Sequence, residues 1–124
     1  MSATLRSVSL LRSFGFALEG VSYLIRTQRS AQIEIVIGVI VIAVAAWLGI
    51  TALEWAVLVI AMALVLALEA LNTAIELAVT LASPQRHPLA KAAKDVAAAM
   101  VLIAAIGTVI VGAIVLGPRV LLVY

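Results

Sequence analysis

Three long apolar runs constrain this chain more than any other feature of its sequence. Residues 35–53 and 96–118 carry no charged side chain, and residues 55–82 carry only two. Of all 124 residues, 66% are hydrophobic and 11% are charged, whereas a soluble domain is about 45–50% apolar and about 25% charged. Polar side chains are too few to cover an apolar core, so a soluble globular enzyme is excluded and the lipid bilayer is the expected solvent.

The apolar runs predict three transmembrane helices. The hydrocarbon layer of a bilayer requires roughly 20 helical residues, and a helix satisfies all of its backbone polar groups there. We therefore expect an all-α integral membrane protein that forms a single domain over residues 1–124, with spans at 32–50, 55–82 and 92–116.

Lysine and arginine positions predict the orientation of these spans. With the N-terminus in the cytoplasm and the C-terminus outside, seven of the eight basic residues lie on the inner side, and only Arg119 lies outside. This is the bias that the positive-inside rule describes.

Residues 1–30 predict an amphipathic helix on the membrane surface. The charged residues Arg12, Glu19 and Arg26 recur every seven positions along one face. The other face carries an apolar stripe, formed by Leu11, Phe14, Leu18, Val21 and Ile25. Such a helix lies in the interface plane, and its apolar run is too short for a secretory signal. The alternative for its charges is a solvated face that only contacts lipid head groups.

Polar residues inside the second span indicate a functional site. Glu69, Asn72 and Glu76 are spaced i, i+3 and i+7, so they project within about 60° of one another. Glu69 and Glu76 lie about 10 Å apart along the helix axis. An acidic residue deep in a bilayer costs on the order of 3 kcal/mol. Two aligned acidic residues favour function, and the alternative is a hydrogen-bond network that only fixes helix packing.

The connection between the second and third spans is polar and basic. Carboxylates here suit Mg²⁺, which takes one or two of them plus substrate phosphates, and Lys and Arg bind phosphoryl oxygens. A buried carboxylate nearby suits proton transfer from a lipid hydroxyl. Lys91 and Asp95 are also spaced for a simple i, i+4 ion pair, and a lone His87 is more often a loop residue than a ligand. The pattern suits phosphoryl transfer to a membrane alcohol, although both glycine-rich nucleotide motifs are missing.

Two motifs resemble those of the prokaryotic diacylglycerol kinase and undecaprenol kinase family. Residues 69–76 read E-A-L-N-T-A-I-E, and residues 93–98 read A-K-D-V-A-A. Residues 14–20, F-G-F-A-L-E-G, are similar to the surface-helix motif of that family. The resemblance extends over about 14–118, which is most of the chain.

This resemblance implies a homotrimer in the bacterial inner membrane that uses Mg-ATP to phosphorylate a lipid alcohol, at composite sites between protomers. Glu69 would be the general base, with Asn72 in the same catalytic pocket. The implied ATP contacts are Phe16, Glu76, Gln85, Arg86, His87, Lys94 and Asp95. The implied lipid contacts are Arg12, Glu69 and Ala98. Glu76 would bind Mg²⁺.

One position departs from the family pattern. The family usually has a Glu where this chain has Gln28, and a neutral amide is a poorer ligand for Mg²⁺ than a carboxylate. Gln28 is therefore a weak second metal ligand. Either Glu34 or Glu19 substitutes for it, or the protein binds metal weakly.

The lipid substrate is implied by a finer resemblance. The Asn72-Thr73 pair and the loop at residues 87–91 look more like the undecaprenol kinase branch of the family, which implies undecaprenol over diacylglycerol.

The alternatives to a kinase are a non-catalytic protein of the same fold and an ion-coupled membrane protein. The second would use Glu69 and Glu76 in proton translocation, as a rotary ring subunit or a drug–proton exchanger does. ATP consumption separates the kinase from all of these.

Overall fold

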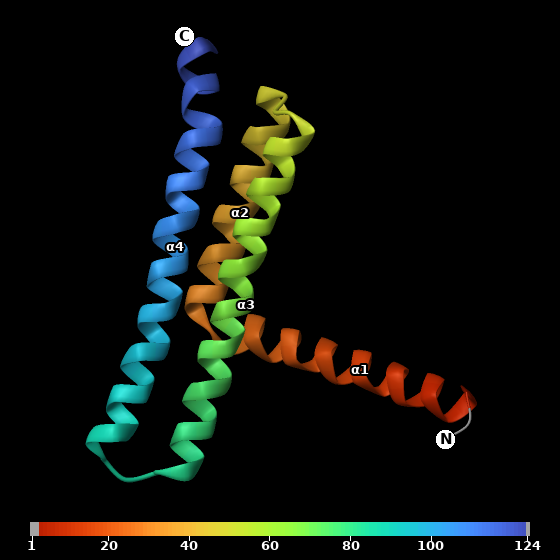
Figure 1. Ribbon diagram of the computed structural model, residues 1–124, viewed down its shortest axis with the longest axis vertical. Helices are drawn as coiled ribbons and strands as arrows, with labels where there is room; N and C mark the ends of the chain where they lie inside the picture. Colours follow the sequence, from red (N-terminus) through yellow and green to blue (C-terminus); the bar gives the residue numbers. More distant parts are fainter. Residues whose placement is uncertain (1–2, 124) are drawn as a thin grey trace.

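Four helices make up the part of the chain that the structure describes. The computed structural model describes residues 3–123, with side chains described for residues 9–122. The helices are α1 (Ala3–Thr27), α2 (Arg29–Leu48), α3 (Ala52–Ala82) and α4 (Pro88–Val123). In Figure 1, α2, α3 and α4 run side by side, and α1 leaves the base of α2 at a steep angle. Each of α2, α3 and α4 is long and apolar enough to cross a membrane, which confirms an all-helical protein with three such helices.

The first two helices meet at a single residue. We expected the surface helix to extend to residue 30 and the first span to begin at 32. In the structure α1 ends at Thr27, because Gln28 adopts an extended conformation (φ −105°, ψ 110°), and α2 begins at Arg29. The Gln32 amide donates a 2.8 Å hydrogen bond back to the Ile25 carbonyl, which ties the two helices together across the joint.

The other helix ends also differ from the expected bounds, because hydropathy marks the apolar stretch and local chemistry sets the ends. Helix α3 begins at Ala52 and not at 55, since Thr51 caps it. Helix α4 begins at Pro88 and not at 92, because proline suits the first helical position. It also continues beyond 116, through Pro118. In lipid the remaining apolar residues gain from staying helical, where their backbone groups are paired.

Helices α3 and α4 form an antiparallel hairpin with the most extensive helix contact in the molecule. In its middle, the Thr108 hydroxyl of α4 donates to the Ala61 carbonyl of α3 at 3.2 Å. Where α2 joins the hairpin, the side chains of Ala45, Leu58 and Val115 pack into the buried core, and Leu58 is 1% exposed. Packing of all three spans is therefore tightest at the end distant from the α3–α4 loop.

The α2–α3 turn is closed by polar contacts. Gly49 adopts a left-handed conformation (φ 68°), which glycine reaches without a steric penalty. The Thr51 side chain and the Glu54 carboxylate form a reciprocal capping box at the start of α3. Arg119 of α4 forms an ion pair with Glu54 and donates a hydrogen bond to the Gly49 carbonyl. These contacts hold the turn against the C-terminal part of α4.

One face of α3 is uncovered in the single chain. It consists of small residues, all exposed, at Ala63, Ala67, Ala70, Ala74 and Ala78. Small side chains permit close approach of another helix. This alanine face is therefore suited to contact with a further helix outside the chain.

Candidate active site

Glu69 is the buried acidic residue at the centre of the candidate site. Its side chain is 2% exposed. The hydroxyl of Ser30, in the first turn of α2, donates a 2.6 Å hydrogen bond to Glu69 Oε1. The neighbouring hydroxyl of Thr73 donates at 3.0 Å to the Glu69 backbone carbonyl and not to its carboxylate. Ser30 alone thus provides a donor that fixes the carboxylate from another helix.

A second carboxyl group lies beside Glu69. The Glu34 side chain, one turn after Ser30 on α2, lies close enough to Glu69 for the two carboxyl groups to interact. The Oε2 atoms of both glutamates are buried and have no partner in the described chain. Sequence reasoning considered Glu34 only as a substitute metal ligand. Ser30 and Glu34 are spaced i, i+4, which places both on one face of α2. This spacing could have indicated the pair from the sequence.

Asn72 and Glu76 continue the polar face of α3 toward the α3–α4 loop. Glu69 is buried, Asn72 is half-buried, and Glu76 is exposed. Exposure therefore increases along the helix over two turns. The site has a closed end at Glu69, suited to a group that must be shielded from water, and an open end at Glu76, suited to a hydrated ion or phosphate.

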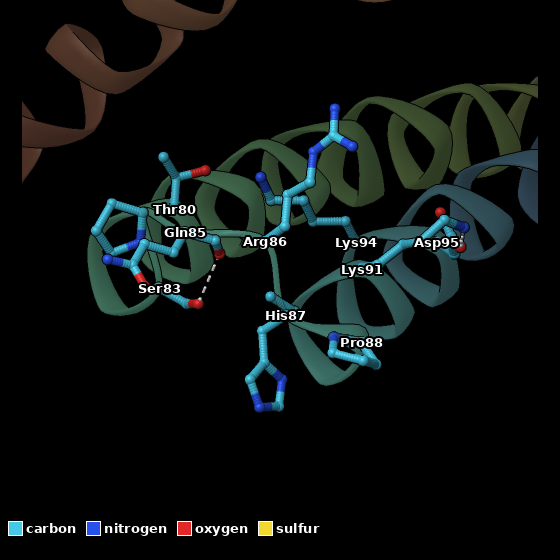
Figure 2. A pocket seen from close by; sticks show the side chains of 11 residues that line it. Thr80, Ser83, Gln85, Arg86, His87, Pro88, Lys91, Lys94 and Asp95 are labelled. Atoms are coloured by element: carbon cyan, nitrogen blue, oxygen red, sulfur yellow. Dashed lines mark hydrogen bonds and ion pairs between the residues drawn. The ribbon is translucent and has the colours of Figure 1, made fainter.

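A cavity of about 650 Å³ lies at the α3–α4 loop. Its volume is in the range of typical ligand pockets. Five of the seven residues expected to contact ATP line it: Gln85, Arg86, His87, Lys94 and Asp95. Figure 2 shows these side chains, with the His87 ring directed away from the Arg86 guanidinium. The loop therefore brings together most of the expected nucleotide residues within one chain.

His87 has a structural role in this loop. Its Nδ1 accepts a 3.1 Å hydrogen bond from the Leu89 backbone N–H, and its carbonyl accepts a 3.0 Å bond from the Lys91 N–H. The first bond satisfies a backbone donor in the first turn of α4 that otherwise lacks a partner, and the second is the first i→i−4 hydrogen bond of the helix. The ring thus acts as a helix cap, in keeping with the interpretation of His87 as a loop residue.

The charges at the start of α4 divide into paired and unpaired groups. Lys91 Nζ lies 2.6 Å from Asp95 Oδ2, which confirms the i, i+4 pairing. Within residues 9–122, where side chains are described, Arg86 and Lys94 take part in no ion pair. These two cations are therefore the ones free to bind an anionic ligand in the cavity.

The residues expected on α1 do not reach this cavity within one chain. Phe16 lines a separate, shallow pocket of about 510 Å³ on α1, together with Glu19, Tyr23 and Arg26. Arg12 is exposed on the same helix. Figure 1 shows α1 directed away from the α3–α4 loop. The structure thus divides the expected nucleotide residues between two places.

Two further expected residues lie on other helices or joints than Glu69. Gln28 is half-buried at the α1–α2 joint, and its amide donates a 3.1 Å hydrogen bond to the Thr27 hydroxyl. Ala98 is exposed on α4. Among the described residues no cluster of three or more His, Asp or Glu side chains is placed to hold a metal ion.

The fold and the site define a small membrane protein with three spanning-length helices, a buried glutamate and a polar cavity at the α3–α4 loop. The profile of the prokaryotic diacylglycerol kinase family matches residues 15–116. The chain belongs to this family, as its motifs indicated.

Curated relatives carry two different lipid names. The diacylglycerol kinase of Synechocystis is 49% identical over 114 residues, covering 91% of this chain and 65% of the relative. The undecaprenol kinase of Bacillus subtilis is 34% identical over 108 residues, covering 87% of this chain and 88% of the relative. The diacylglycerol kinase of Pseudomonas aeruginosa is 34% identical over 95 residues, covering 77% of each chain. This chain spans just under two thirds of the Synechocystis relative's length. These relatives are named as lipid kinases, with either lipid as the substrate.

Proposed function

We propose that this protein transfers the γ-phosphoryl group of ATP to the hydroxyl of a membrane lipid alcohol. The observation that carries the proposal is the state of Glu69, which is 2% exposed, fixed at Oε1 by Ser30 and unpartnered at Oε2. A buried carboxylate with one free acceptor oxygen is suited to take a proton from a hydroxyl group. Membership of a family of lipid kinases supports the same reaction.

In this reaction the lipid hydroxyl oxygen attacks the γ-phosphorus in line with the departing ADP. The bond from the γ-phosphorus to the β–γ bridging oxygen breaks, and Glu69 Oε2 accepts the hydroxyl proton. Asn72, one turn from Glu69, would orient the hydroxyl. Phosphoryl transfer depends mainly on positioning and charge stabilisation. A base that is held rigidly in place therefore contributes to the rate through its position.

The loop cavity is the proposed nucleotide site. Arg86 and Lys94, which have no ion-pair partner in the described side chains, would bind phosphate oxygens. Glu76 would hold Mg²⁺, because its carboxylate is exposed and this ion usually needs only one or two carboxylates besides phosphates and water. When bound, Mg²⁺ neutralises charge on the β- and γ-phosphates. Gln28 would contribute less than a carboxylate, since its amide is neutral and already bonded to Thr27.

The proposed active unit is a homotrimer with its N-terminus in the cytoplasm. The exposed alanine face of α3 supports helix contact with a second protomer. The separation of Phe16 from the loop cavity within one chain supports a composite site, in which α1 of one protomer completes the site of its neighbour. Helix α1 would lie on the membrane surface, and Arg12 and Ala98 would border the lipid.

We propose undecaprenol as the preferred lipid. The Asn72-Thr73 pair and the loop at residues 87–91 support this choice, and a relative named undecaprenol kinase matches most of the chain. Diacylglycerol is the competing substrate, because the Synechocystis and Pseudomonas relatives carry that name.

The test is transfer of labelled phosphate from γ-labelled ATP in mixed micelles, with undecaprenol and diacylglycerol offered separately. Label is expected in the lipid, with more in undecaprenol, and Glu69→Gln should abolish it. Glu54→Gln, which removes a carboxylate at the α2–α3 turn, is the matched control and should retain activity. Absence of label in both lipids, from folded oligomeric protein, would refute the kinase and favour proton translocation or a non-catalytic role.

A further inference from the structure

The start of α2 directs two polar side chains at Glu69. Ser30 and Glu34 are four residues apart, so they lie on the same face of α2. Ser30 Oγ donates a 2.6 Å hydrogen bond to Glu69 Oε1, and the Glu34 carboxyl group lies close enough to Glu69 to interact with it. The family resemblance gives no role in catalysis to either residue.

The side chains of Ser30, Glu34 and Glu69 do not all have their hydrogen-bonding groups satisfied. Glu69 Oε1 has a donor, whereas the Oε2 atoms of Glu69 and Glu34 are both buried and have none. An ionised carboxylate can only accept hydrogen bonds, and two ionised carboxylates in contact repel each other. A single proton held between the two groups relieves the repulsion and leaves the pair with one negative charge.

We propose that Ser30 and Glu34 are positioning residues for Glu69. Ser30 fixes Oε1, so that Oε2 is the oxygen available to the lipid hydroxyl. Glu34 shares one proton with Glu69, so that the two carboxyl groups together carry a single negative charge. This inference rests on the lipid kinase reaction proposed above and adds two residues to it.

The proton count of the reaction follows from this arrangement. The pair takes up the proton that the hydroxyl loses as its oxygen bonds to the γ-phosphorus and ADP departs. It then holds two protons and no net charge. One proton returns to water after the product leaves, through Glu34, which is half-buried where Glu69 is buried.

Thr108 provides a control for Ser30. It is half-buried on α4, and its hydroxyl donates to the Ala61 carbonyl of α3 at 3.2 Å. Thr108→Val removes a hydroxyl that bonds one helix to another and leaves the carboxylate contact intact. A loss of activity caused only by removing a hydroxyl between helices would appear in both Thr108→Val and Ser30→Ala.

The first experiment measures kcat and both KM values for the full chain and for Ser30→Ala, Ser30→Thr and Thr108→Val. Ser30→Ala is expected to lower kcat about tenfold or more, as loss of a hydrogen bond to a charged group predicts. Both KM values should stay within about twofold, because the bond positions the base and does not bind substrate. Ser30→Thr should recover most of kcat, and Thr108→Val should resemble the wild type. Equal losses in Ser30→Ala and Thr108→Val, or no recovery in Ser30→Thr, would overturn the role of Ser30.

The second experiment reads the shared proton directly and does not depend on turnover. The infrared spectrum of the purified protein at neutral pH should contain the carbonyl band of a protonated carboxyl group. Glu34→Gln and Glu69→Gln should each remove this band, since the introduced amide donates to the remaining carboxylate. Ser30→Ala should shift it, and Glu54→Gln should leave it unchanged. A band that persists in both glutamine variants, or its absence from the wild type, would overturn the shared proton.

The two experiments separate the failure of this inference from the failure of the kinase. An active wild type whose Ser30→Ala variant keeps its kcat refutes the positioning role and leaves the kinase standing. A wild type that transfers no phosphate but shows the carboxyl band, lost in both glutamine variants, refutes the kinase and keeps the proton-sharing pair.

Discussion

Two of the three glutamates on helix α3, Glu54 and Glu69, lie in opposite environments, and their difference separates a structural carboxylate from a catalytic candidate. Glu54, at the α2–α3 turn, accepts a 3.0 Å hydrogen bond from the Thr51 N–H and forms an ion pair with Arg119. Glu69 has one hydroxyl donor, an acidic neighbour and an oxygen without any partner. Buried polar groups are normally satisfied. Glu54, whose carboxylate is fully hydrogen-bonded, therefore stabilises the contact between α3 and α4. Glu69 keeps one carboxylate oxygen available for a ligand.

The largest effect should separate these two glutamates. Glu69→Gln keeps the size of the side chain and removes its basicity, so kcat should fall by about 10²–10⁴-fold, the usual contribution of a general base. Glu54→Gln should keep kcat and lower thermal stability, because it weakens the contact with Arg119. Phosphate transfer and thermal unfolding in detergent measure the two effects. An active Glu69→Gln variant, or an inactive but folded Glu54→Gln variant, would invalidate the distinction.

A smaller effect is expected at the open end of the site. Glu76→Gln should raise the KM for Mg-ATP by about tenfold, since it removes the proposed metal ligand while leaving the buried base in place. The KM for lipid should change little. Initial rates over a range of Mg²⁺ concentrations provide the measurement, and an unchanged Mg²⁺ dependence would remove Glu76 from the metal site.

The departure at Gln28 offers a gain-of-function test. Gln28→Glu restores the carboxylate that the family usually has, so the half-saturating Mg²⁺ concentration should decrease by about threefold to tenfold. Gln32→Glu adds the same charge one turn further along α2 and serves as a control for charge. It also removes the amide donor to the Ile25 carbonyl, so its thermal stability is measured as well. Equal effects of the two substitutions would indicate a general electrostatic change and not a metal ligand.

The smallest effect on activity is expected at the α2–α3 turn. Gly49 has a φ of 68°, and open space surrounds the position that a Cβ atom would occupy. Gly49→Ala should therefore cost about 1 kcal/mol of stability, from the backbone conformation alone. Phosphate transfer should remain at the wild-type level. A large loss of activity in a folded Gly49→Ala protein would show that the two ends of α3 are coupled.

Prediction from the sequence was most successful for features that depend on residues within a single helix. Long apolar runs indicated the three spanning-length helices, and the i, i+4 rule gave the Lys91–Asp95 pair. It missed contacts between helices, because they depend on how one helix is rotated against another. Ser30 and Glu69 are 39 residues apart, and Arg119 and Glu54 are 65 apart. Neither spacing has a periodic pattern that a sequence displays.

The length of α3 has a consequence for the order in which substrates bind. Its 31 residues extend about 46 Å, against roughly 30 Å of hydrocarbon. A helix that enters the hydrocarbon near Ala52 leaves it about 20 residues later, close to Asn72. In the proposed reaction the lipid therefore reaches Glu69 from within the bilayer, while the nucleotide reaches the loop from water. Neither substrate blocks the route of the other, so either can bind first. Initial-rate plots should then intersect, and ADP should form only when the lipid is present.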